Sequence, residues 1–74
     1  MFNLEIGQEL EFIEPTNADG VEIKKGTRVR VAAFVKEVVE SKVTLVLLGK
    51  PTPEVLTVDR HVVTMHCRPL QKSV

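Results

Sequence analysis

The sequence predicts a small antiparallel all-β domain, and three observations lead to that class. The stretch from Gly26 to Leu48 holds two alternating apolar and polar runs separated by a short polar turn, which is typical of a β-hairpin. β-branched residues dominate these runs and favour strands over helices. The chain has 74 residues, so we expect a single domain over residues 1–74. A domain of this size buries little core, and a partner or second subunit would help to stabilise it.

The first strand is predicted at Glu9–Ile13, because Leu10 and Phe12 alternate with glutamates and would share one face. Residues Pro15–Gly20 combine proline, asparagine, aspartate and glycine, which are the usual turn residues. We interpret this segment as an exposed loop outside any hydrogen-bonded ladder. A short return strand is predicted at Val21–Ile23.

The next strand is predicted at Arg28–Ala33, where the valines and Ala33 would point inward. Phe34 then falls on the wrong face. Either a β-bulge near Ala32–Ala33 shifts the register, or Phe34 points outward and another surface covers it. In both cases the β-branched segment Phe34–Val39 continues as a strand, since it is too short for an isolated helix.

The second half of the chain predicts three more strands. A polar turn at Glu40–Lys42 leads into Val43–Leu48, which is apolar on both faces apart from one threonine and is therefore expected to be central or covered. The loop Gly49–Pro53 contains two prolines, which cannot donate to a ladder. Glu54–Val58 is the next strand, and Val62–Cys67 is the last.

Polar residues interrupt the pattern between the last two strands, at Asp59–His61. A short 3-10 turn near residues 59–61 fits this interruption, and we expect Asp59 to close the turn through contacts with its own backbone. Pro69 ends the last strand. The tail at residues 71–74 is expected to be frayed.

The charges are divided unevenly along the chain. Residues 1–23 contain six acidic and no basic residues, whereas ten basic and four acidic residues follow from Lys24 onward. Glu9 and Glu11 share one strand face, as do Arg28 and Arg30. Opposite charges on neighbouring strands stabilise a sheet by about 0.2–1 kcal/mol per pair. We therefore expect folding to pair these groups, and the alternative is a basic surface for nucleic acid.

The layout as a whole has about five short strands, one long early loop, tight central hairpins and a polar turn before the last strand. It resembles the SH3-like small β-barrels over nearly the whole chain, which implies a five-stranded antiparallel barrel. Within it, the segment Lys25–Val31 looks like the opening of a KOW-type motif, in which a glycine turn precedes alternating valines. That resemblance implies an RNA-linked or ribosome-linked role.

Few residues suggest catalysis or metal binding. His66 and Cys67 are adjacent on a predicted strand, so they point to opposite faces and cannot easily share one ion. We expect Cys67 to be a small buried apolar residue and His66 to point outward. The sequence thus predicts no catalytic residue, no metal and no cofactor.

Localisation follows from two absences in the sequence. No apolar run approaches the roughly 18 residues of a membrane span, and the first residues show no signal-peptide pattern. One cysteine provides no disulfide framework within the chain and fits a reducing compartment. A cytoplasmic location is therefore expected, without a membrane partner.

The function predicted from these features is a non-enzymatic protein-interaction module. Apolar residues exceed what a thin barrel can bury, and exposed apolar patches usually mark interfaces. The module would bind another protein or a second copy of itself, through a sheet face or an edge strand; the expected contact residues are Phe34, Val46 and Leu48.

Two alternatives stay open. One is a nucleic-acid accessory protein that uses a basic hairpin, with phosphates bound by Arg28, Arg30, Lys36 and Lys42. The other is an oligomeric enzyme with a site shared between subunits, for which no residue pattern suggests a reaction.

Overall fold

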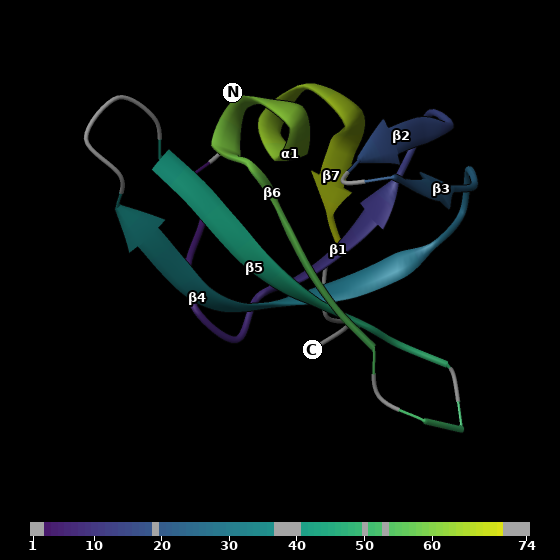
Figure 1. Cartoon of the computed structure of the whole chain (residues 1–74), viewed down its shortest axis with the longest axis horizontal. Helices are drawn as coiled ribbons and strands as arrows, with labels where there is room; N and C mark the ends of the chain where they lie inside the picture. Colours follow the sequence, from purple (N-terminus) through teal and green to yellow (C-terminus); the bar gives the residue numbers. More distant parts are fainter. Residues whose placement is uncertain (1–2, 19, 37–40, 50, 53, 71–74) are drawn as a thin grey trace.

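The computed structural model describes residues 3–18, 20–36, 41–49, 51–52 and 54–70. Strands make up most of the described chain, and a single short helix precedes the last of them (Figure 1). In chain order the elements are β1 (Glu9–Phe12), β2 (Thr16–Ala18), β3 (Val21–Ile23), β4 (Arg28–Lys36), β5 (Ser41–Leu47), β6 (Glu54–Asp59), α1 (Arg60–His66) and β7 (Cys67–Pro69). The predicted all-β class is confirmed.

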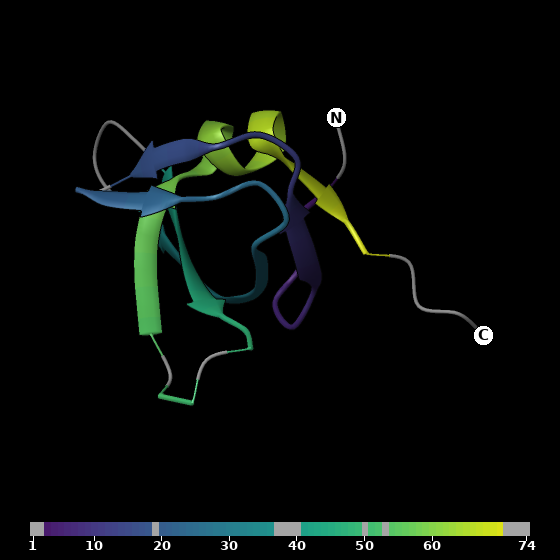
Figure 2. The ribbon, with the colours of Figure 1, turned by 90° about the vertical axis from the view of Figure 1, so that its right-hand side faces the viewer.

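Five strands form one antiparallel sheet in the order β6-β5-β4-β1-β7, and β2 pairs with β3 in a separate hairpin. The sheet curls around the interior, with the β2–β3 hairpin and α1 across one end (Figure 2). Within the described residues the edge strands β6 and β7 are not paired with each other, so the sheet is open. As predicted, the apolar strand β5 is central, between β4 and β6.

The bulge in β4 is confirmed. Val31 lies opposite Leu45 while Ala33 lies opposite Thr44, so Ala32 is the additional residue. The shift places Phe34 opposite the fully buried Val43. Phe34 therefore shares the inner face of the sheet, although it remains 41% exposed because β4 extends past the core.

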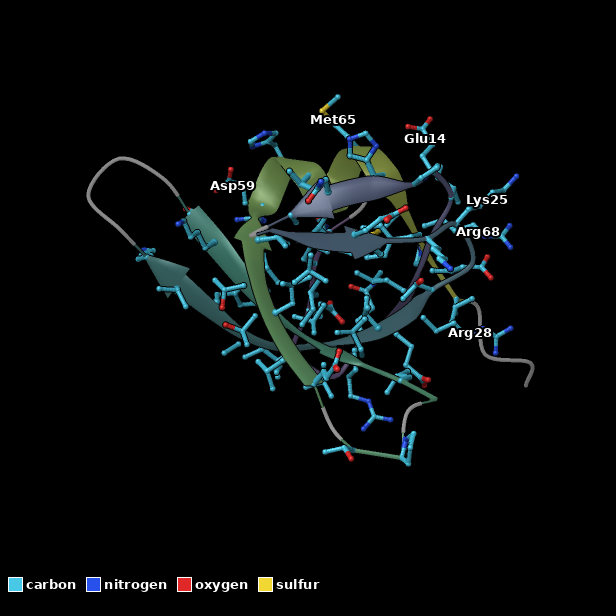
Figure 3. The ribbon with its side chains drawn as sticks, turned by 45° about the vertical axis from the view of Figure 1, so that its right-hand side comes forward. Glu14, Lys25, Arg28, Asp59, Met65 and Arg68 are labelled. Atoms are coloured by element: carbon cyan, nitrogen blue, oxygen red, sulfur yellow. The ribbon has the colours of Figure 1, made fainter. Side chains whose placement is uncertain are left out.

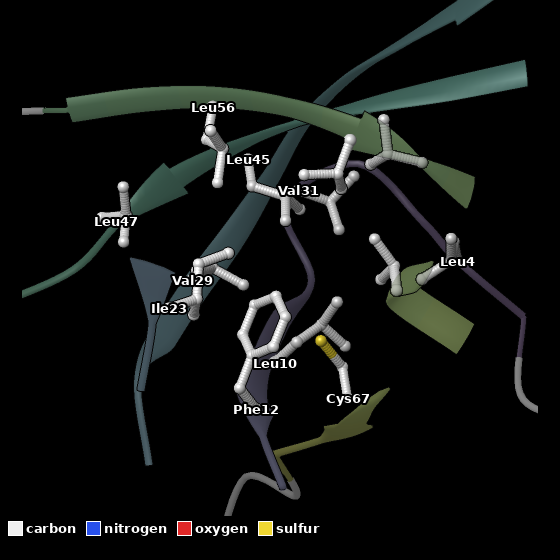
Figure 4. Packing of buried hydrophobic residues seen from close by; sticks show 13 residues of the cluster. Leu4, Leu10, Phe12, Ile23, Val29, Val31, Leu45, Leu47, Leu56 and Cys67 are labelled. Carbon is white, nitrogen blue, oxygen red and sulfur yellow. The ribbon is translucent and has the colours of Figure 1, made fainter. Parts of the chain in front are cut away.

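The core is a single cluster built from the inner faces of the strands (Figure 4). Leu10 and Phe12 of β1 are fully buried, and Val63 of α1 and Leu4 of the N-terminal segment belong to the same cluster. All its members are apolar side chains or the thiol of Cys67, and no charged or polar side chain is buried among the described residues. The core is therefore held by apolar burial, the dominant favourable contribution to folding.

The prediction that Pro15–Gly20 stays outside any ladder is wrong. Thr16 pairs with Ile23 and Ala18 with Val21, so β2 and β3 are joined by only two residues. Those two residues are Asp-Gly in sequence, a typical two-residue hairpin turn, and Gly20 has the left-handed φ of 74° that such turns require.

The prediction of a strand at Val62–Cys67 is also wrong, and the 3-10 turn expected near 59–61 is an α-helix. Helix α1 covers Arg60–His66, and the last strand begins only at Cys67. Burial of Val63 and the need to carry the chain from β6 across to β7 outweigh the strand preference of β-branched residues. Thr64 fits the helix because its hydroxyl donates to the His61 carbonyl at 3.1 Å.

One smaller difference concerns the pairing of β4 with β5. Ser41 and Lys42 belong to β5, where a polar turn was predicted. The predicted strand end at 37–39 and the predicted fraying at 71–74 lie outside the described residues.

Candidate functional site

The three predicted contact residues do not lie on one surface. Val46 and Leu48 are half-buried on the outer face of the sheet, whereas Phe34 is on the inner face. The predicted contact is therefore divided between the two faces of the β4–β5 pair.

The outer face of β4, β5 and β6 carries an apolar patch in its middle. Val46 lies directly opposite Val55, whose side chain is 62% exposed. One step along the same face, the hydroxyls of Thr44 and Thr57 are hydrogen-bonded at 3.3 Å. Leu48 extends the patch toward β4, where its N–H donates to the Arg28 carbonyl at 2.9 Å. We call Val46, Leu48 and Val55 the outer patch.

Val55 was not among the predicted contact residues. The alternation of Glu54–Val58 places Val55 and Thr57 on the same strand face, and this signal is present in the sequence. Its position beside Val46 depends on the pairing register of β5 and β6, which sequence patterns alone leave open.

The predicted basic residues are also separated. Arg28 and Arg30 lie on the outer face of β4, opposite Glu11 and Glu9, so the predicted opposition of charges across β1 and β4 is confirmed. Lys36 shares the inner face with Phe34. Val46 is the residue of β5 opposite Arg30, and Lys42 lies four residues from Val46 along the strand. Four strand residues span about 13 Å. The four side chains therefore do not form one compact stripe.

Glu11 forms an ion pair with Arg68. The Nε and Nη2 atoms of Arg68 donate to Glu11 Oε1 at 2.9 and 2.7 Å. Figure 3 shows Arg68, Arg28 and Lys25 projecting toward the same side. Because a glutamate lies among these cations, their field at the surface is partly neutralised.

A second polar contact joins the C-terminal end of α1 to the segment after β1. His66 Nδ1 lies 2.9 Å from Glu14 Oε2, and the Ile13 N–H donates to the His66 carbonyl at 2.8 Å. His66 is thus outward, as predicted. The contact holds the end of the helix beside the first strand.

Cys67 is buried, as predicted, and only 4% exposed. Its sulfur lies in the same cluster as Leu10 and Phe12 (Figure 4). Burial raises the pKa of the Cys67 thiol from 9.0 to about 12. At neutral pH the thiol is protonated, so it lacks the thiolate that a nucleophile or metal ligand requires.

The polar turn gives no catalytic arrangement. Asp59 occupies the N-cap position of α1, but its side chain makes no capping hydrogen bond, contrary to the expected backbone contact. His61 is exposed on the helix. Among the residues that the structure describes, no three His, Cys, Asp or Glu side chains are placed to hold one metal ion.

The described surface has several shallow hollows. A groove of about 270 Å³ runs along the exposed side of Phe34, between Leu4 and Arg60. A cleft of about 230 Å³ separates β2 from the C-terminal half of β6, with Ala18 on one side and Thr57 on the other. A wider depression of about 560 Å³ lies beside Leu48.

No family model, curated protein or solved structure matches this chain. No helix in the described part of the chain has the length and apolar character needed to cross a lipid bilayer. The described residues form a small antiparallel all-β domain with one short helix, an apolar patch on its outer face and a groove beside Phe34.

Proposed function

We propose that this chain is a non-enzymatic, cytoplasmic protein-interaction module. Its contact surface consists of the outer patch and the edge of β6, and the partner that this arrangement fits best is a second copy of the chain. One observation carries the proposal. Val55, on the edge strand β6, lies directly opposite Val46 of β5, and both side chains are on the solvent-facing side of the sheet. Apolar side chains beside an uncovered edge favour the addition of another strand.

We also propose that the fold is an SH3-like barrel. Support comes from the order β6-β5-β4-β1-β7, from the β2–β3 hairpin within the long connection after the first strand, and from α1 immediately before the last strand. The bulge at Ala32 bends β4, which pairs with β1 on one side and β5 on the other. The KOW-like opening at Lys25–Val31 lies within this bent strand and its preceding turn, and by itself identifies no partner.

The backbone pattern shows which groups of β6 face the edge. Leu48 donates to β4, so on β5 the alternate residues Leu47, Leu45 and Val43 bond to β6. Their partners on β6 bond back to β5. The N–H and C=O groups of Val55 and Thr57, which lie between those partners, therefore point away from the sheet.

The other edge of the sheet is a poorer place for strand addition. The Leu70 N–H donates to Glu9 and the His66 carbonyl accepts from Ile13, so Cys67 and Pro69 are the residues of β7 whose backbone faces outward. The Cys67 N–H already donates to the Val63 carbonyl, and proline has no N–H. Strand β7 thus offers no outward donor.

Antiparallel pairing of two β6 strands around a twofold axis satisfies the outward groups of both chains. An axis beside Leu56 places Val55 of one chain opposite Thr57 of the second. This register extends to Thr57, which lines the cleft beside Ala18 of β2, and does not require Val58 or Asp59. The row formed by Val46 and Val55 would then continue, on the same outer face, into Thr57 and Thr44 of the second chain.

Nucleic-acid binding through the basic hairpin has less support. Glu9 and Glu11 stand opposite Arg30 and Arg28, and Lys36 is on the other face. Phosphate binding needs a cationic surface whose charge is not cancelled by adjacent carboxylates. A salt-dependent shift with a DNA or RNA oligonucleotide that is lost on reversal of Arg28 and Arg30 would favour this alternative.

The outer patch is tested by Val46→Glu. A carboxylate placed opposite Val55 replaces apolar surface next to the joint by a charge, whereas in the monomer it can reach water because Val46 is half-exposed. We expect the variant to stay folded by circular dichroism and to sediment as a monomer. Ile13→Glu is the matched control: Ile13 is 40% exposed at the far side of the sheet, and its substitution should leave association unchanged.

The edge is tested by Val55→Pro. Because the Val55 N–H points outward, proline removes an intermolecular donor without breaking the β5–β6 ladder. Val55→Thr keeps the N–H and serves as its control. Loss of dimer with proline and retention with threonine is the expected result; equal association of both variants would contradict the proposed use of the edge.

A further inference from the structure

Among the described residues, Phe34 is the only aromatic residue outside the core, and its position is unusual. It lies on the inner face of β4 but beyond the bulge, and 41% of it is exposed. The guanidinium carbon of Arg60 is 6.0 Å from its ring centroid, which is the outer limit of a cation–π contact. Phe34 thus presents an apolar ring beside a fixed positive charge.

These two side chains line the groove of about 270 Å³ noted above, which we call the Phe34 groove. The apolar residues that line it are Leu4, Phe34 and Val35. Its rim is cationic, and the described charged residues that line it are Lys36, Lys42 and Arg60. None of the described lining residues is acidic.

We propose that the Phe34 groove binds an acidic segment of another protein, one that presents an apolar side chain between carboxylates. The apolar side chain would displace water from Phe34 and Val35, while the carboxylates approach Lys36 and Arg60. Complementary charge around a small apolar centre is the arrangement that fixes register and excludes wrong partners.

The composition of the groove favours a peptide over nucleic acid. Single-strand binding relies on successive aromatic platforms, and among the described residues Phe34 is the one aromatic side chain that lines this surface. The groove lies at the opposite end of the β4–β5 pair from the outer patch, so it is a second surface and goes beyond the proposed self-association.

The test uses the full chain and a fluorescent peptide of alternating glutamate and leucine, with binding followed by anisotropy at low and high salt. A glutamate–serine peptide of equal length and charge measures the apolar contribution, and a single-stranded DNA oligonucleotide measures phosphate binding. We expect the glutamate–leucine peptide to bind most tightly and its affinity to fall as salt is added.

Lys36→Glu should weaken binding by about tenfold or more, because it replaces attraction by repulsion. Arg30→Glu reverses an equal charge on the outer face of the same strand and should leave the affinity unchanged. Phe34→Ala should remove the preference for leucine over serine; if that variant does not fold, Lys36→Glu still decides. The Val46→Glu monomer should bind the peptide as the unmodified chain does.

Three results would overturn the inference: absence of peptide binding, tighter binding of the oligonucleotide than of the glutamate–leucine peptide, or equal effects of Lys36→Glu and Arg30→Glu. None of them bears on the outer patch, since association of the chain is measured separately.

Discussion

Raising the pH tests the burial of Cys67 most directly. The folded thiol has a pKa of about 12 and the unfolded thiol a pKa near the ordinary value of 9.0. Between those values the unfolded chain releases a proton that the folded chain retains. The unfolded state therefore binds fewer protons, and the free energy of unfolding falls as the pH rises.

The size of the effect follows from the pKa of the thiol in the unfolded chain. Between about pH 8 and about pH 10 the unfolded thiol changes from roughly one-tenth to roughly nine-tenths ionised, while the folded thiol stays protonated. The resulting loss is about 1 kcal/mol of unfolding free energy. This loss of stability requires only that the pKa of the folded thiol lie well above the upper pH. Burial of Cys67 raises that pKa to about 12.

The assay is urea unfolding at both pH values for the natural chain and for Cys67→Ala. Circular dichroism is the suitable signal, because the sequence contains no tryptophan or tyrosine. Other groups titrate equally in both proteins, so the thiol contribution is the difference between their pH-dependent losses. If Cys67→Ala loses as much stability as the natural chain, the thiol is accessible and the described burial is wrong.

Three further predictions concern stability and are measured by the same unfolding assay. Phe12→Ala, at a fully buried position, should cost about 3–5 kcal/mol and leave the chain largely unfolded, and a loss below about 1 kcal/mol would contradict its central place in the core. Gly26→Ala should cost about 1–2 kcal/mol, because φ is 91° there although nothing blocks a Cβ atom; an unchanged midpoint would mean that the turn relaxes. Arg68→Ala should cost less than about 1 kcal/mol, since Arg68 is 64% exposed, and a larger loss would show that its pair with Glu11 organises β7.

Strands with one solvent-exposed face were predictable because apolar and polar residues alternate along them with a period of two. The alternation around Leu10 predicts β1, and the continuous apolar run around Leu45 predicts a central β5. The misplaced Phe34 likewise indicates the bulge, since an additional residue is the simplest way to restore the inner face. Each of these features depends on residues that are close together in the sequence, so a local pattern is enough to predict it.

Helix α1 was not predictable in this way. Its residues Val62 and Val63 favour a strand, but the chain must cross from β6 to β7 at that point and only one of the two valines is buried. That requirement comes from the sheet order, which is a property of the whole fold. Tertiary context therefore overrides local preference here.

The candidate site was predicted as a list of residue types and not as a surface. Val46 and Leu48 were recognised by their excess apolar character, but their neighbour Val55 is set by the pairing of β5 with β6. The bulge in β4 shifts the pairing register and places Phe34 on the other face, beside Arg60. Register is specified by turns and burial together, so a surface that spans strands depends on the assembled sheet.

Sedimentation equilibrium of the purified chain over a wide concentration range, at low and high salt, tests the proposed interaction module most directly. We predict a mass that rises from that of one 8.3 kDa chain to that of two, with little dependence on salt because apolar contacts and backbone hydrogen bonds form the joint. The Val46→Glu and Val55→Pro variants should remain at the lower mass. A chain that stays monomeric at millimolar concentration would contradict self-association through β6 and the outer patch.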